Sequence, residues 1–298
     1  MFVIKHRKKF FAISGLLVLA SLFLIFTRGL NIGIDFTGGS AFEIKYAENR
    51  PEVSVAKQAL NENGIEVANI RPFGDSSFIL QIKSTDSETQ EAILALLTQL
   101  NPELQLEMVD PHIIGPSVGA ELRSKALIAI ITVSLAIILF IAYSFRHASE
   151  KVSSWKYGMI AVLALVHDII VPTGLVAFLG IEVSSLFIIA LLAILGLSVN
   201  DTIVVFDRVR ENIKLKISKD FSETVGKSLD QTFIRSINTS LTTLFVVFAL
   251  YFIGPESTKD FALVLAAGLV VGTYSSIFIA SPLLVEVEKR EKTQNKKK

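Results

Sequence analysis

The sequence contains no cysteine and only four histidines among its 298 residues. Without cysteine the chain can form neither a disulfide framework nor a thiolate metal site, and no HExxH motif is present. Two glycine-rich motifs occur, but neither continues into the Gly-Lys-Ser/Thr of a phosphate-binding loop. These absences argue against thiol chemistry, and we expect no metal site.

Charged residues are also scarce, at 19% of the chain, while 51% of the residues are hydrophobic and the mean hydropathy is +0.55. A soluble domain of this size is less apolar. Six segments are long enough to cross a bilayer core of about 30 Å. They are Phe10–Thr27, Ala126–Phe145, Tyr157–Leu179, Ser184–Phe206, Ser236–Ile253 and Phe261–Val285.

Positive residues gather on one side of this six-span arrangement, which holds 20 of the 29 lysines and arginines. The positive-inside rule assigns that side to the cytoplasm. We therefore predict that both termini are cytoplasmic, with a tail and first helix over 1–29, the remaining helices over 123–285, and a basic tail over 286–298. No small-x-small site closes the first apolar run, so we do not expect a cleavable signal peptide.

Residues 30–122, between the first two spans, are predicted to form one domain outside the membrane. Apolar residues alternate in four stretches and follow helical spacing in two. Their order is strand, helix, strand, strand, helix, strand, which is typical of a small α+β domain of ferredoxin-like form. Acidic residues outnumber basic ones, 14 to five. This excess indicates either a solvated acidic surface or a surface that handles unfolded or basic chains.

Two glycine motifs flank this domain: GIDFTGG at 33–39 and GPSVGAEL at 115–122. Glycine tolerates positive φ and close backbone approach, so both motifs are predicted to be shaped necks between domain and membrane. Two roles for Asp35 stay open, a turn cap and a hinge that lets the domain tilt. The predicted neck residues are Gly33, Asp35, Gly38, Gly39, Gly115 and Gly119.

An acidic residue, Asp201, lies inside the fourth predicted span. Insertion scales assign an ionised side chain at the bilayer centre a cost of roughly 2.5–3.5 kcal/mol, so a surviving one is interpreted as functional by default. Asp201 lies about 9 Å past the midpoint of its span, towards the cytoplasmic side. It is the leading candidate for a functional group, with Asn200 beside it.

The fifth span begins with Arg235, followed by Asn238, Thr239 and Thr242 along one helical face. In lipid such a polar stripe is expected to turn inward. Arg235 and Asp201 match in depth within a turn or two, so an ion pair or a proton-coupled switch between them is geometrically allowed. The alternative is that Arg235 is a positive-inside anchor that reaches the headgroups.

The third span carries His167 and Asp168 at its centre. Such a pair resembles a proton relay or a metal pair. Adjacent helical residues point about 100° apart, however, so we expect that both cannot face one small site. The alternative is a structural pair that neighbouring helices satisfy.

Two further patterns concern packing and the cytoplasmic side. Gly268 and Gly272 have the GxxxG spacing of closely packed membrane helices. Residues 207–234 are polar, positively charged and weakly amphipathic, which predicts a short helix lying at the cytoplasmic surface.

Several motifs together resemble the SecD/SecF family of protein-export membrane proteins, which belongs to the RND-type superfamily. They are GIDFTGG, GPSVGAEL, the His-Asp pair, VNDTIVVFDRVREN and RSINTSLTTL. The resemblance covers essentially the whole chain. It implies an RND-type half of six transmembrane helices in the bacterial inner membrane, acting as an auxiliary subunit of the Sec translocase.

The resemblance also implies a mechanism. With a second six-span half, SecD, the chain would use the proton motive force to assist and complete export of preproteins through SecYEG. YajC and YidC are further candidate partners, and no nucleic acid is expected. The family's fourth-span acid falls on Asp201 and its fifth-span arginine on Arg235. The implied coupling ion is H⁺, with Na⁺ left open. The resemblance implies no cofactor and no enzymatic activity.

Three other functions are alternatives. An RND-type proton-driven exporter of small molecules or lipids shares the buried acid. An intramembrane aspartyl protease would use Asp168 and Asp201, but their depths differ and the GxGD form of such enzymes is absent. A purely structural scaffold leaves the buried acid unexplained.

Overall fold

The computed structural model describes residues 1–47, 50–83, 86–100, 106–145 and 154–295. Its contacts divide the chain into two compact units. The first combines Met1–Asn31 with Ile128–Lys298 and is helical, and the second covers Ile32–Leu127 and contains a sheet. Each unit has its own hydrophobic core.

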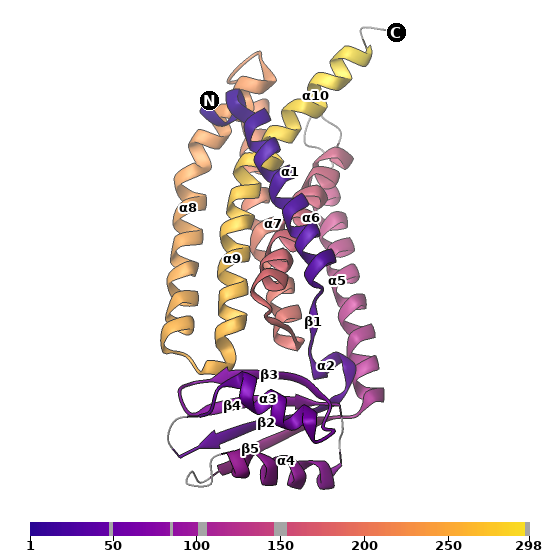
Figure 1. Cartoon of the computed structure of the whole chain (residues 1–298). Helices are drawn as coiled ribbons and strands as arrows, with labels where there is room; N and C mark the ends of the chain where they lie inside the picture. Colours follow the sequence, from indigo (N-terminus) through magenta and orange to yellow (C-terminus); the bar gives the residue numbers. More distant parts are fainter. Residues whose placement is uncertain (48–49, 84–85, 101–105, 146–153, 296–298) are drawn as a thin grey trace. The chain divides into compact units, whose positions relative to one another are not determined.

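Among the described residues, six helical segments are long and apolar enough to cross a membrane, as the sequence predicts. The N-terminus and α10 lie at the same end of the helical bundle (Figure 1). The segments are α1 (Phe2–Arg28), α5 (Pro116–Ser144), α6 (Ser154–Leu179), α7 (Ser185–Lys214), α8 (Phe221–Ile253), and a last one of α9 (Lys259–Ser275), the π-helical turn η2 (Ser276–Ala280) and α10 (Ser281–Asn295).

The prediction of a separate surface helix over 207–234 is wrong. Helix α7 continues unbroken to Lys214, and α8 begins at Phe221. The two form a hairpin whose polar contacts are internal, because the buried Asn212 amide donates to Ser228 Oγ at 2.8 Å and to Gln231 Oε1 at 2.7 Å. These hydrogen bonds, together with buried apolar side chains, extend both helices past the ends of the predicted spans.

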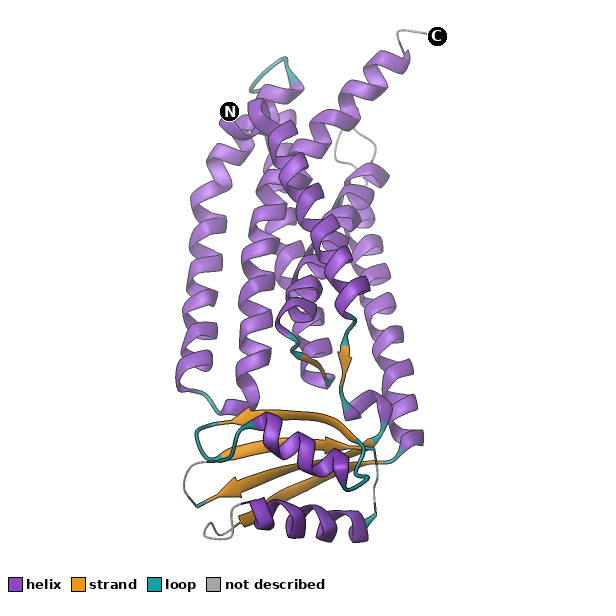
Figure 2. Ribbon diagram, in the orientation of Figure 1, coloured by secondary structure: helices purple, strands orange, loops and turns teal. Residues whose placement is uncertain are grey.

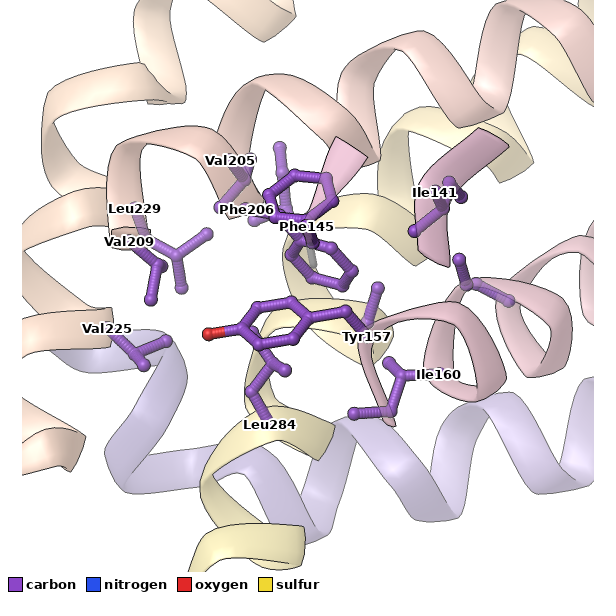
Figure 3. Close-up of a cluster of buried hydrophobic side chains, with 14 of the residues drawn as sticks. Ile141, Phe145, Tyr157, Ile160, Val205, Phe206, Val209, Val225, Leu229 and Leu284 are labelled. Atoms are coloured by element: carbon purple, nitrogen blue, oxygen red, sulfur yellow. The ribbon is translucent and has the colours of Figure 1, made fainter. Parts of the chain in front are cut away.

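An aromatic cluster fills one end of the helical core (Figure 3). The Phe145 and Tyr157 rings stack with centroids 5.4 Å apart, and Phe206 meets the Tyr157 ring edge-on at 5.2 Å. Such contacts add to the free energy gained by burying the rings. Val205, Val209, Val225, Leu229 and Leu284 pack around them, so α5, α6, α7, α8 and α10 are joined at this point.

The second unit contains a four-stranded sheet with α3 and α4 on one face (Figure 2). The strand order is β3-β4-β2-β5, and each neighbouring pair is antiparallel. The elements are β2 (Gly39–Tyr46), α3 (Val53–Glu62), β3 (Val67–Phe73), β4 (Ser77–Ile82), α4 (Ser87–Leu100) and β5 (Leu106–Ile114). This is the strand and helix order predicted from the sequence.

The core of this unit follows from period-two alternation in the strands. Phe42, Ile44, Phe78, Leu80 and Ile82 are all at most 1% exposed and point to the helical face. Shorter elements complete the chain: β1 (Asn31–Ile32), α2 (Ile34–Thr37), β6 (Glu182–Val183) and the 3₁₀ turn η1 (Glu256–Thr258).

The two glycine motifs pack against each other inside the second unit. A side chain at Gly119 would lie 2.8 Å from the backbone nitrogen of Gly38, and one at Gly38 would lie 2.7 Å from Cα of Pro116. Gly38 and Gly39 also have φ of +76° and +134°, which side chains rarely adopt. Gly33 is the N-cap residue before α2, and Asp35 lies in the first turn of that helix, where an acid is favourable.

Candidate functional site

Asp201 lies on α7 with only 6% of its surface exposed. Its Oδ2 accepts a hydrogen bond from the Ser240 hydroxyl of α8 at 3.4 Å, which is long for an O–H···O bond. The Ser240 hydroxyl is also 2.5 Å from the Thr273 hydroxyl of α9. The carboxyl group is therefore buried among three helices but is weakly held.

Arg235 lies close enough for its charge to act on Asp201. Among the described residues, however, the two make no ion pair within 4.0 Å, and Arg235 itself is exposed. The prediction that these residues form a pair was based on their matching depth in the membrane. The structure places the two charges within electrostatic range of each other without direct contact.

The expectation that the α8 stripe turns inward is wrong for this chain. Arg235, Asn238, Thr239 and Thr242 are all exposed, and so is Asn200 on α7. The face of α8 that packs against its neighbours carries smaller hydroxyl groups instead: Thr232, Ser236 and Ser240. Small side chains allow helices to approach closely, so they occupy the contact and the larger polar groups face outward.

Asp168 on α6 is fully buried and accepts hydrogen bonds from three directions. Its Oδ2 accepts from Ser198 Oγ of α7 at 2.5 Å and from Ser275 Oγ of α9 at 2.7 Å. Its Oδ1 lies 2.9 Å from His167 Nδ1. One carboxyl group thus joins three membrane-spanning helices.

The expectation that His167 and Asp168 cannot face one site is therefore wrong. Their Cα–Cβ directions do diverge, but an imidazole ring is long enough to bring Nδ1 back onto the neighbouring carboxylate. The alternative interpretation, a pair that neighbouring helices satisfy, describes Asp168 well. It does not describe His167, because its buried Nε2 has no hydrogen-bond partner among the described residues.

Gly268 and Gly272 bring α9 against α7. A side chain at Gly268 would lie 2.1 Å from Ile194, and one at Gly272 would lie 2.9 Å from Cβ of Ser198. The second contact has a direct consequence, because Ser198 is a donor to Asp168. The glycine spacing therefore positions the polar site as well as the helices.

The sequence analysis did not single out the hydroxyl residues Ser198, Ser240, Thr273 and Ser275. Serine and threonine are common in membrane helices, where they often bond to the backbone of their own helix. A usable signal existed for two of them: Ser198 lies one turn before Asp201, and Ser240 lies within the RSINTSLTTL motif. No group of three or more His, Cys, Asp or Glu side chains suited to a metal occurs among the residues described.

Comparison with known proteins identifies the family. The model of the C-terminal region of the protein-export membrane proteins SecD/SecF matches residues 93–290, and the SecD/SecF GG-motif model matches residues 23–49. The chain belongs to the SecD/SecF family. The residues at the two polar sites of the bundle all fall within the first of these matches.

Relatives of the SecD/SecF family match almost the full length. The protein translocase subunit SecF of Thermobaculum terrenum is 36% identical over 97% of this chain and 94% of its own length. That of Haemophilus influenzae is 36% identical over 95% of this chain and 85% of its own. The translocase subunit SecDF of Thermus thermophilus is also 36% identical, but this chain spans only 38% of it.

Solved structures of SecDF share the fold. The crystal structure of SecDF from Thermus thermophilus, described as a translocon-associated membrane protein, has a TM-score of 0.85 at 34% identity. It covers 96% of this chain, which spans 38% of that structure. A crystal structure of SecDF in a super-membrane-facing form has a TM-score of 0.72 over 99% of this chain and 39% of its own.

Proposed function

We propose that the chain is an accessory subunit of the Sec translocase that uses the proton motive force to assist export of preproteins through SecYEG. Family membership supports the translocase role. One structural observation carries the coupling: Asp201 is buried between helices, is held by one long hydrogen bond, and lies near the Arg235 charge.

This arrangement can respond to a proton. A charged Asp201 attracts Arg235 across the α7–α8 contact, and protonation removes that attraction. Because Arg235 makes no direct ion pair with Asp201, protonation changes the attraction between the two residues without breaking a contact. A coupling machine needs such an element, one whose equilibrium a charge change can shift. H⁺ is the proposed coupling ion, and Na⁺ is the alternative that the experiment below distinguishes.

The outward polar face supports a partner within the membrane. No described residue hydrogen-bonds the Asn238 amide or the Arg235 guanidinium, and polar groups facing lipid are costly. A second protein surface would cover them. SecD is the proposed partner, which the SecDF relative supports because this chain matches only 38% of it. SecYEG and the preprotein, with YajC and YidC, complete the proposed assembly.

Sidedness follows from charge. The end of the bundle that carries the N-terminus, the α7–α8 turn and α10 is also rich in lysine and arginine (Figure 1). We assign this end to the cytoplasm of a bacterial inner membrane and the α+β unit to the periplasm. The glycine motifs keep their proposed role as necks. Because they pack on each other, bending is expected at Gly29, which has φ of +73° and where an added Cβ would meet no atom within 4 Å.

The test is export into inverted inner-membrane vesicles under an imposed proton or sodium gradient. Wild type is compared with Asp201→Asn, which keeps the shape of the side chain and removes its charge. The matched control is Asp207→Asn, an exposed acid on the same helix whose ion pair is with Arg210. We expect gradient-dependent export to be lost in Asp201→Asn and kept in Asp207→Asn, at equal protein levels.

Normal gradient-dependent export by Asp201→Asn would refute the coupling role. If a sodium gradient but not a proton gradient stimulates export by the wild type, the coupling ion is Na⁺, and Asp201 remains the proposed site. Cysteine crosslinking tests the proposed partner surface, since the natural chain has no cysteine. One cysteine replaces Asn238, and a control cysteine replaces Leu19, which is exposed elsewhere on the bundle. Crosslinks to SecD are expected from position 238.

A further inference from the structure

The helical bundle contains a second ionisable pair, His167 and Asp168, which the Asp201 mechanism does not use. Both side chains are at least nine-tenths buried, with 6% of His167 and none of Asp168 exposed. Neither forms an ion pair with any other described residue. The Asp168 carboxylate has three side-chain hydrogen-bond partners, on His167, Ser198 and Ser275.

The hydrogen-bond geometry fixes where a proton lies. Ser198 and Ser275 donate their hydroxyl hydrogens to Asp168 Oδ2. A carboxylate oxygen can only accept, so His167 Nδ1 carries the hydrogen of its bond to Oδ1. In a histidine ring the hydrogen bond that one nitrogen makes decides which nitrogen is protonated. This leaves Nε2 with a free lone pair. It is the only atom of the cluster without a hydrogen-bond partner among the described residues.

From these contacts we propose that His167 and Asp168 form a second proton-binding site of this chain, with His167 Nε2 as the atom that gains and loses the proton. On uptake an N–H bond forms at Nε2 as an O–H bond of a hydronium ion breaks and releases water, so a neutral imidazole beside a carboxylate becomes an imidazolium–carboxylate pair. On release the same bond breaks. The source of the proton is the gradient of the proposed function, on which this inference rests.

The surroundings of the pair contain few competing charges. Helix α9 presents Tyr274, whose ring stacks on His167 with centroids 6.4 Å apart. Helix α1 presents the Ser14 hydroxyl, which donates to Tyr274 rather than to His167. The nearest acid along α7 is Asp201, one turn from Ser198 and bonded to Ser240 instead. η2 has no ionisable residue, and in α10 Glu286 pairs with Arg7.

A charge change at this site would be felt by three helices. Asp168 is bonded directly to α7 and α9, and Ser275 is the last residue before the π-helical turn η2. π-helical turns are frequent at functional sites. Ser198 also lies one turn from Asp201 on α7. A change in the protonation of this pair would therefore act directly on α7, the helix that carries Asp201.

The test is a ¹⁵N-histidine NMR titration of the full chain in lipid nanodiscs, from about pH 5 to about pH 8. The chain has four histidines, and His167→Gln identifies the signal of interest. We expect the wild type to show the tautomer with hydrogen on Nδ1 and to convert reversibly to the doubly protonated ring within this range. Asp168→Asn should remove the tautomer preference, because the carboxylate that accepts from Nδ1 is gone.

One protonation state of His167 across the whole range, or a tautomer with hydrogen on Nε2, would overturn the proposal. This measurement uses the wild type, so the proposal stays testable even if Asp168→Asn does not fold. It is also independent of export. A titrating His167 with normal export by Asp201→Asn would refute the proposed coupling role and leave the second site standing.

Discussion

The two buried carboxyl groups of the bundle are held in opposite ways. Asp168 has no exposed surface and accepts three hydrogen bonds of 2.5–2.9 Å from side chains on α6, α7 and α9. Asp201, one turn from one of those donors, has a single hydrogen bond of 3.4 Å and lies beside a polar face that no described residue covers.

The difference separates two uses of a buried acid. A fully bonded carboxylate fixes the helices that donate to it, and removing it leaves several donors unsatisfied. A weakly bonded carboxylate loses little when a neighbouring helix moves. We interpret Asp168 as the fixed point of the bundle and Asp201 as the point at which the bundle can change.

The largest expected effect comes from removing each acid in turn. Asp168→Ala should lower the free energy of unfolding by about 3–5 kcal/mol, because His167, Ser198 and Ser275 lose their common partner. Asp201→Ala should cost no more than about 1 kcal/mol, since only one long hydrogen bond is lost. Thermal unfolding in detergent, followed by circular dichroism, measures both. Equal losses would mean that the two sites do not differ as proposed.

A second variant acts on Asp168 at a distance. A methyl group at Gly272 would lie 2.9 Å from Cβ of Ser198 and push that donor away from the carboxylate. Gly272→Ala should therefore cost about 1–3 kcal/mol, as overpacking usually does. The matched control is Gly196→Ala on α7, where an added Cβ would meet no atom within 4 Å. If both variants are equally stable, the close contact of α7 and α9 is not what holds Ser198.

The serine donors give a finer comparison. Ser198→Ala removes a 2.5 Å hydrogen bond to Asp168 and should cost about 1.5–3 kcal/mol if that carboxyl group is charged. Ser240→Ala removes the 3.4 Å bond to Asp201 and should cost about 0.5 kcal/mol. The same unfolding measurement applies. A larger loss in Ser240→Ala would show that Asp201 is held more firmly than its geometry indicates.

A stabilising effect is expected in the α+β unit, whose core cluster is apolar. Its Tyr46 is 1% exposed, and its hydroxyl has no hydrogen-bond partner among the described residues. Tyr46→Phe removes this unsatisfied group, so it should stabilise the unit by about 1 kcal/mol. Amide hydrogen exchange of the sheet in the full chain measures the change.

The pH dependence of the same variant follows from burial, which raises the pKa of Tyr46 from 10.0 to about 12. Between these values the unfolded chain loses the phenolic proton while the folded chain keeps it. Folding stability should therefore fall as the pH rises from 10 towards 12. Tyr46→Phe should lack this part of the loss. A constant difference between wild type and variant across that range would contradict it.

The sequence predicted those features that follow from hydropathy and residue order. Uncharged runs located the six spans, and the alternation of apolar residues gave the strand and helix order of the α+β unit. Both signals extend over many residues, so single exceptions do not disturb them. The boundary residues of the spans were less accurate, because α7 and α8 pack on each other beyond the membrane-length segments.

Contacts between helices were not predictable in the same way. The outward direction of Asn238 depends on which face of α8 meets α7 and α9, and the sequence contains two polar faces from which to choose. The bond between His167 and Asp168 depends on side-chain reach. Ser275 contacts Asp168 across 107 positions of sequence, and no local pattern marks it as a donor.

The π-helical turn has a consequence for how the last membrane segment tolerates change. Such a turn contains one residue more than the corresponding α-helical turn. The extra residue is accommodated within the turn, so side chains of the helix on either side keep their directions. Here Ser281 Oγ reaches the Ser276 carbonyl oxygen, five residues back, at 2.8 Å. Deleting one residue within 276–280 should therefore leave Ser275 and Leu284 on their present faces, whereas a deletion in the middle of α7 would turn half of that helix by about 100°. The last segment of the bundle thus contains a place where the chain can shorten by one residue without losing its register.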